Sequence, residues 1–306
     1  MFISGLTIIR NGVRLDYPFL EAIRSALPIC DEYVVVVGDS DDQTLEAIEG
    51  LEDSKMRVIQ SAWSNRVKPQ RYVLSQQTNI GLHLCRGDWV VCLQGNEVLH
   101  ESSLPALVGL MEKHNPDRSV EALLLERLTF WGDYHHVIAV YPERFKFTPR
   151  IVRPYLGTYA IRDAMSFAVF DNFSTRGRYP RAVDTGENIF RYGYVQTDQQ
   201  RRQKISEAIH FADHPDTDIS VQYYYQEVPR QFVRRFTGTH PAVMAERLEA
   251  TPDRISLEDG RWRVKPTLKE RQRIWETRYY ERYGLPRLRK TRYSLVGSYK
   301  RKPKCY

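Results

Sequence analysis

The sequence predicts an α/β protein built on a mostly parallel β-sheet with helices on both faces. Over residues 1–120, short apolar runs rich in β-branched residues alternate with stretches that carry apolar residues at helical spacing. The chain has 306 residues, 42% of them hydrophobic and 27% charged, which is ordinary usage for a folded protein. This length suits two domains, or one large domain with an extension.

The first part of the predicted fold has three strands of the sheet, connected by two helices. Residues 2–9 are an apolar run, and Asn11-Gly12 ends it as a loop does. Apolar residues at helical spacing predict a helix over 19–27, which Pro28 stops. The valine-rich run at 33–37 is typical of a parallel strand that is covered on both faces. The alternation continues with a helix at 44–51 and a strand at 56–59.

A fourth strand follows a third helix. Helical spacing over 73–85 and the turn residues Gly87-Asp88 lead into the apolar run 89–93. Pro105 then begins another helix, which ends near His114. Alternating strands and helices of this kind imply a parallel sheet with right-handed crossovers.

Polar residues follow three of the expected strands. The clusters are Arg10-Asn11, Asp39 to Asp42 and Gln94 to Glu97. Ligands of open α/β sheets bind at the carboxyl ends of the strands, so we expect these three clusters to line one crevice.

Several common sites have no motif in this sequence. The segment 9–13 is not GxGxxG, and neither a GxxxxGK[ST] phosphate loop nor a GxSxG elbow is present. No pair of histidines four residues apart stands beside a glutamate, as the zinc-hydrolase motif requires. The four cysteines form no CxxC pair, which favours reduced thiols in the cytoplasm. The N-terminus does not resemble a secretory leader, and no apolar run approaches the ~18 residues that span a bilayer.

The basic excess of the chain lies at its C-terminal end. Residues 1–190 carry 20 basic and 24 acidic residues, whereas 191–306 carry 25 and 14. Residues 261–306 alone contain 16 basic and 3 acidic residues, a balance that favours an anionic partner such as a membrane surface, a phosphorylated glycan or nucleic acid. The alternative is a solvated basic helix with a frayed end.

The order of the motifs resembles family 2 glycosyltransferases of the GT-A fold over about residues 3–195. It is similar to bacterial-type members with a QGDE- or QADE-like motif in place of DxD. The stretches that carry the resemblance are Thr7-Ile8-Ile9-Arg10-Asn11, residues 31–44, Gln77-Thr78-Asn79-Ile80-Gly81, residues 87–101, Tyr159-Ala160-Ile161-Arg162-Asp163 and Phe190-Arg191-Tyr192-Gly193-Tyr194-Val195.

The resemblance implies roles for residues on the donor side. It implies that Asp39 and Asp41 contact the nucleoside of the donor and that Arg10 and Asn11 lie at the edge of the nucleoside. Gln94 and Asn96 occupy the acidic positions of the DxD motif, which leaves Glu97 as the carboxylate of that turn.

A divalent ion, Mg²⁺ or Mn²⁺, would be held by Asn96 and Glu97. Arg191 stands where relatives often have a histidine. Its guanidinium could substitute for the ion, so we expect the requirement for metal to be weak.

On the acceptor side, Asp163 matches the acid that removes the proton of the acceptor hydroxyl, usually with inversion at the anomeric carbon. The alternative is that Asp163 pairs with Arg162 or Arg150 and is structural.

The predicted organisation is a GT-A domain at 1–197 followed by a basic, mainly helical extension at 198–306. Residues 1–120 form the nucleotide-sugar half and 121–197 the aromatic acceptor half, with short strands at 123–125 and 150–152. In the extension we expect helices at 198–210 and 268–283. The second would dock on the main domain or lie on a membrane through one face, made of Leu268, Trp275, Tyr279 and Tyr283.

Together these observations predict a cytoplasmic glycosyltransferase that moves a sugar from a nucleoside-diphosphate sugar to a glycan or lipid-linked glycan, with possible peripheral contact with an anionic membrane through the basic tail. One alternative is a nucleotide-sugar-binding protein with impaired catalysis, which the residues Gln94 and Asn96 favour. The less favoured alternative is a nucleic-acid-binding protein that uses the basic tail, with the aromatic residues at 275, 279, 280 and 283 as stacking groups.

Overall fold

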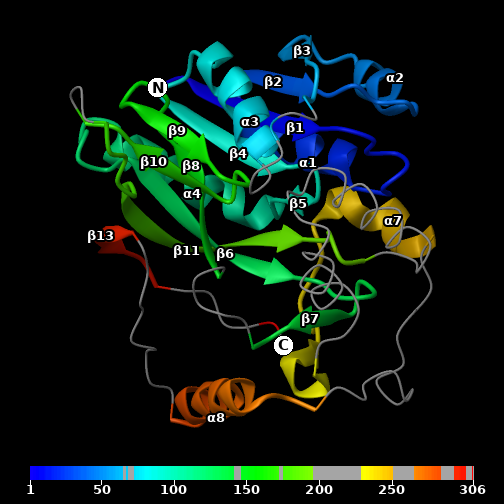
Figure 1. The fold of residues 1–306 in the computed structure, drawn as a ribbon, viewed down its shortest axis with the longest axis vertical. Coiled ribbons are helices and arrows are strands. Elements are labelled where there is room, and N and C mark those ends of the chain that lie inside the picture. Colours follow the sequence, from blue (N-terminus) through cyan, green and yellow to red (C-terminus); the bar gives the residue numbers. More distant parts are fainter. Residues whose placement is uncertain are drawn as a thin grey trace.

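The computed structural model describes residues 1–64, 67, 72–140, 146–171, 175–195, 229–250, 265–283, 293–300 and 305. These residues form a nine-stranded sheet, with strands in the order β13-β11-β6-β8-β4-β1-β2-β3 and β5 paired to β11, and two small two-stranded sheets (Figure 1). The sheet is mostly parallel, with helices on both faces, as predicted.

The nucleotide-sugar half contains the predicted strands and helices. Its strands are β1 Ile3–Ile9, β2 Glu32–Val37, β3 Met56–Gln60 and β4 Trp89–Gln94. Its helices are α1 Phe19–Ala26, α2 Thr44–Glu49, α3 Tyr72–Leu84 and α4 Leu104–His114, with short 3₁₀ turns at Leu27–Ile29 and Glu101–Ser103. The four strands pair in parallel, with β1 between β2 and β4.

The valine run of β2 serves two hydrophobic cores, because successive side chains of a strand point to opposite faces. Val35 and Val37 pack in the core that contains residues of α1 and α4, while Val34 and Val36 pack in the core under α3. A strand buried on both faces needs apolar residues at every position, which explains the unbroken run.

The second half contributes strands that the sequence pattern shows only in part. They are β5 Glu97–Val98, β6 Ala122–Thr129, β7 His136–Ile138, β8 Phe147–Val152, β9 Thr158–Ile161, β10 Ser166–Val169 and β11 Arg181–Arg191. β8 lies antiparallel between β4 and β6, and β11 runs parallel to β6. The pattern misses β11 because a bulge between Asp184 and Asn188 interrupts its alternation.

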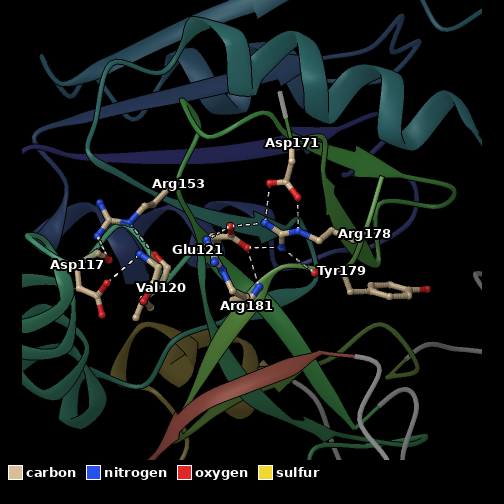
Figure 2. Close-up of polar contacts among 9 residues, drawn as sticks. Asp117, Val120, Glu121, Arg153, Asp171, Arg178, Tyr179 and Arg181 are labelled. Atoms are coloured by element: carbon tan, nitrogen blue, oxygen red, sulfur yellow. Dashed lines mark hydrogen bonds and ion pairs between the residues drawn. The ribbon is translucent and has the colours of Figure 1, made fainter. Parts of the chain in front are cut away.

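A cluster of ion pairs fastens the start of β11 to the rest of the sheet. The buried Glu121 carboxylate accepts hydrogen bonds from the side chains of Arg178 and Arg181, and Arg178 also pairs with Asp171 (Figure 2). Nearby, the Arg153 guanidinium lies 4.0 Å from the ring centroid of Trp89 and donates to carbonyl groups near the end of α4. These contacts lie at the carboxyl-terminal end of β8 and the starts of β6 and β11.

The region beyond residue 197 contributes one described strand to the main sheet and one to a separate two-stranded sheet. β13 Ser294–Ser298 pairs in parallel with β11, and β12 Val233–Arg235 pairs with β7. Its other described elements are the short turns Arg230–Phe232 and Ala242–Met244 and the helices α7 Ala245–Ala250 and α8 Leu268–Arg282. The predicted helix at 198–210 lies outside the described residues.

The prediction that the aromatic residues of α8 dock it on the main domain is wrong. Ile274 and Thr277 are the buried residues of this helix, and Ile274 packs with Val140 and Phe232. Trp275 and Tyr279 lie on another face, with 64% and 41% of their surfaces exposed. Leu268 and Tyr283 are exposed as well. No helix in the described part of the chain is long and apolar enough to cross a membrane.

Candidate active site

The three predicted polar clusters meet at the carboxyl ends of β1, β2 and β4. Asn11 joins the loops after β1 and β2: its Oδ1 accepts from the backbone N–H of Asp41 over 3.1 Å, and its own N–H donates to Ser40 Oγ over 3.1 Å. Asn11 has a φ of 50°, a left-handed conformation that asparagine tolerates, and is 1% exposed. This burial gives Asn11 the role of holding the loops together.

Arg10, Asp39 and Trp63 lie together beside these strand ends, and we call this group the rim of the candidate site. Arg10 Nε donates to the carbonyl oxygen of Asp39 over 3.0 Å, and its guanidinium lies 6.0 Å from the ring centroid of Trp63. The backbone N–H of Trp63 donates to Asp39 Oδ2 over 3.3 Å. At Gly38 an added Cβ would lie 2.4 Å from Trp63 Nε1, so the indole packs directly on the glycine backbone. Sequence reasoning missed Trp63, although an aromatic residue just beyond the third strand was the available signal.

Asp41 lies at the outer side of the same loop. Its Oδ1 is 2.5 Å from Arg14 Nη2, and 65% of its side chain is exposed. The hydrogen bond from Arg14 lowers the pKa of Asp41, so the carboxylate is ionised and accessible. The next residue, Asp42, accepts from the backbone N–H groups of Arg14 and Thr44 just before α2.

Glu97 is fully buried beneath the turn that follows β4. Arg150 Nε and Nη2 donate to its two carboxylate oxygens over 2.6 Å and 3.0 Å, and Arg127 Nε lies 3.6 Å from Oε1. Burial acts to raise the pKa of Glu97, but the charges of Arg150 and Arg127 outweigh it and the pKa is lowered. The backbone N–H of Gln94 donates to Glu97 Oε2 over 3.2 Å and closes the turn.

The residues of this turn do not fit the metal site that the resemblance implies. Both oxygens of Glu97 are occupied by Arg150, so an ion would have to displace a guanidinium from a buried position. Asn96 Oδ1 is buried without a hydrogen-bond partner among the described residues, but an amide oxygen is a weak ligand alone. The described ranges contain no group of three or more histidine, cysteine, aspartate or glutamate residues that could hold an ion.

Arg191 lies beside the same turn. In the pairing of β11 with β5, Arg191 is opposite Glu97, and the N–H of Tyr192 donates to the carbonyl oxygen of Asn96 over 2.9 Å. The guanidinium of Arg191 lies 4.7 Å from the ring centroid of Tyr194. Arg191, Asn96 and Glu97 therefore belong to one compact cluster.

Asp163 lies in the turn between β9 and β10. Asn79 on α3 fixes this hairpin: its amide donates to the carbonyl oxygen of Ala160 over 3.1 Å and accepts from the N–H of Ala160 over 2.7 Å. Asp163 is half-buried, and its Oδ1 accepts from the N–H of Met165 over 3.4 Å. None of the described residues forms an ion pair with Asp163, and Arg150, one of its expected partners, is bound to Glu97 instead.

Arg150 connects the two sides of the site. Besides its bonds to Glu97, its Nη1 donates to the carbonyl oxygen of Ala164, next to Asp163, over 3.3 Å. A pocket reaches from the end of β4 to the Asp163 turn; it is lined by Leu6, Ile8, Thr78, Cys92, Leu93, Gln94, Arg150, Ala164 and Phe167. Sequence reasoning missed the role of Arg150, although a charged residue within the apolar run of β8 was a signal that it needed a buried partner.

The sequence matches a family model, that of glycosyl transferase family 2, over residues 18–170, which is half of the chain. The chain belongs to this family. It is therefore a glycosyltransferase, and its α/β sheet is the architecture that the resemblance to GT-A enzymes implies. No curated protein sequence matches the chain.

Solved structures of glycosyltransferases resemble this chain weakly. A structure of S. aureus TarS in complex with UDP has 16% sequence identity and a TM-score of 0.42, and the match covers 74% of this chain and 70% of that one. Glucosyl-3-phosphoglycerate synthase from Mycobacterium tuberculosis, in complex with Mn²⁺, UDP and phosphoglyceric acid, has 19% identity and a TM-score of 0.29, with 42% and 43% covered. The family assignment rests on the sequence match.

Proposed function

We propose that this glycosyltransferase moves a sugar from a nucleoside-diphosphate sugar to a hydroxyl group of a glycan or lipid-linked glycan. The observation that carries the proposal is the position of Arg150, which binds Glu97 under the predicted diphosphate turn and the Ala164 carbonyl beside the predicted base. One rigid side chain thus relates the donor side of the site to its acceptor side. Transfer depends on such positioning because little covalent machinery is needed.

On the donor side, the exposed carboxylate of Asp41 and the rim formed by Arg10 and Asp39 would contact the nucleoside. Trp63 offers a ring at the same rim. Gln94, Asn96 and Arg191 would hold the diphosphate, because amide groups and a guanidinium donate hydrogen bonds to phosphate oxygens. Glu97 would keep Arg150 and Arg127 in place and would not contact the donor.

On the acceptor side, Asp163 would act as the general base. Its carboxylate would take the proton of the acceptor hydroxyl while the oxygen attacks the anomeric carbon and the nucleoside diphosphate leaves from the opposite face. This displacement inverts the configuration of the sugar. The environment of Asp163 supports the proposal: the residue is half-buried, and no cationic side chain among the described residues forms an ion pair with its carboxylate.

The test is a transfer assay with Asp163→Asn. The amide keeps the shape of the side chain but cannot take a proton, so transfer should fall by ~100-fold or more while nucleotide binding stays. Asp171→Asn is the matched control, because Asp171 is an exposed residue paired with Arg178. Normal transfer by Asp163→Asn, or equal losses in both variants, would show that Asp163 is structural. Binding of nucleotide without any transfer by the unaltered chain would favour the catalytically impaired alternative.

The same enzyme would work in the cytoplasm, in peripheral contact with an anionic membrane. Three of its cysteines, Cys30, Cys85 and Cys92, are free and buried, which suits a reducing compartment.

The exposed rings of Trp275 and Tyr279 lie on a helix within the basic region and support the proposed membrane contact. Vesicles containing anionic lipid should sediment the chain at low salt, and Trp275→Ser should weaken this. Binding to RNA in place of vesicles would favour the nucleic-acid alternative.

A further inference from the structure

A segment from the C-terminal region contacts the nucleotide-sugar half of the chain. Arg247 on α7 pairs with Asp16, in the loop after β1, over 2.7 Å and with Glu21 on α1 over 2.6 Å. Thr239 Oγ1 lies 3.1 Å from His100 Nε2, just beyond the predicted diphosphate turn. Residues 229–250 therefore touch the nucleotide-sugar half at two separate places.

His240 is the central residue of this segment. Its Nε2 is 2.9 Å from the carbonyl oxygen of Tyr134, which can only accept, so Nε2 carries the proton. Nδ1 is then the acceptor, and the hydroxyl of Tyr192 donates to it over 2.8 Å. Burial lowers the pKa of His240 to about 4, so the ring is neutral and this arrangement is complete near pH 7. The ring packs 4.8 Å from that of Phe130 and 4.9 Å from that of Phe236.

The backbone around Tyr192 contacts the predicted diphosphate turn after β4. Its N–H donates to the carbonyl oxygen of Asn96, and its preceding residue is Arg191. The following residue, Gly193, lies so close to Asn96 that an added Cβ would be 2.6 Å from Asn96 Nδ2. A shift of the Tyr192 backbone would therefore move both predicted diphosphate contacts, Asn96 and Arg191.

We propose that His240 is a positioning residue for the donor diphosphate, acting through the hydroxyl of Tyr192 to hold the Tyr192-Gly193 backbone against Asn96. This inference rests on the proposed function, because it assumes that Asn96 and Arg191 bind the diphosphate. It makes the C-terminal segment part of the donor site. Loss of the contact should weaken donor binding, seen as a higher Kd and KM, with a smaller effect on kcat.

The experiment is a double-mutant cycle read by calorimetric titration with UDP, GDP and dTDP. Tyr192→Phe removes the hydroxyl and keeps the ring, and His240→Phe keeps an aromatic ring without the acceptor. Each should weaken binding of the nucleotide by about three- to tenfold, the effect of one hydrogen bond. The double variant should bind no more weakly than the weaker single variant. His240→Asn, whose amide oxygen can replace Nδ1 as acceptor, should recover most of the affinity.

Tyr33→Phe is the matched control, because it removes a buried hydroxyl that bonds Thr7 within the sheet, 2.9 Å away. Affinities of Tyr192→Phe and His240→Phe equal to that of the unaltered chain, or losses no larger than that of Tyr33→Phe, would overturn the inference and leave the proposed function standing. Additive losses in the double variant would also overturn it. If His240→Phe does not fold, Tyr192→Phe and His240→Asn decide the question. If the unaltered chain binds none of the nucleotides, both the proposed function and this inference fail.

Discussion

Arg150 and Glu97 form a two-point ion pair in the interior of the protein, with Nε and Nη2 of the guanidinium 2.6 Å and 3.0 Å from the two carboxylate oxygens. Arg127 approaches the same carboxylate from a second strand. The pair joins β5, next to the predicted diphosphate turn, to β8 in the middle of the sheet. Glu97 therefore has a structural role, in place of the metal-ligand role that the resemblance implies.

Glu97→Gln should therefore destabilise the fold. The substitution leaves two buried guanidinium groups without their counter-charge, and breaking a buried ion pair in this way costs about 3–5 kcal/mol in the free energy of unfolding. Urea denaturation measures the loss. Asp41→Asn is the control, because the Asp41–Arg14 pair is exposed and should be worth less than about 1 kcal/mol. Similar small losses in both variants would contradict this account of Glu97.

Nucleotide binding should depend on Arg191 more than on a divalent ion. Because Glu97 is occupied by Arg150, we expect similar nucleoside-diphosphate affinities in EDTA and in Mn²⁺. Arg191→Ala should lower the affinity by about tenfold or more, since a guanidinium makes charge-assisted hydrogen bonds with phosphate. Arg181→Ala, at the other end of β11, is the matched control. A large loss of affinity in EDTA would show that an ion is bound after all.

His240 should make the fold sensitive to mild acid. Its pKa is lowered to about 4 in the folded chain, whereas an unfolded histidine takes up a proton near pH 6.5. Between these values the unfolded state binds more protons, so stability falls as the pH drops from about 6.5 to 4 and is constant above that window. Because His240 is partly exposed, we expect a loss of about 1–2 kcal/mol. In urea denaturation, the free energy of unfolding should differ less between pH 7 and pH 5 for His240→Asn than for the unaltered chain. Equal differences in the two chains would show that His240 is not the group responsible.

The four parallel strands of the nucleotide-sugar half were predictable because each contains a local apolar run. β2 needs apolar residues at successive positions to fill two cores, and this requirement is visible in residues 33–37 alone. Regular packing of this kind leaves a pattern in the sequence.

Other parts of the site were not predictable, because they depend on partners far away in the chain. Arg150 contacts Glu97 across 53 residues, and His240 contacts Tyr192 across 48. The aromatic residues of α8 misled the prediction for a related reason. Ile274 and Thr277 are buried while the aromatic residues are exposed, and nothing in the local pattern of the helix distinguishes the two faces.

The most direct test of the central claim, that the crevice at the ends of β1, β2 and β4 binds a nucleoside diphosphate, is a thermal unfolding screen of the unaltered chain. UDP, GDP, CDP, ADP and dTDP would each be added at about 100 times the expected Kd. A ligand that binds only the folded state at this concentration stabilises it by about 2.7 kcal/mol, so one nucleotide should raise Tm by at least about 4 °C. The rise should be much smaller in Arg191→Ala. An unchanged Tm with every nucleotide would contradict the account.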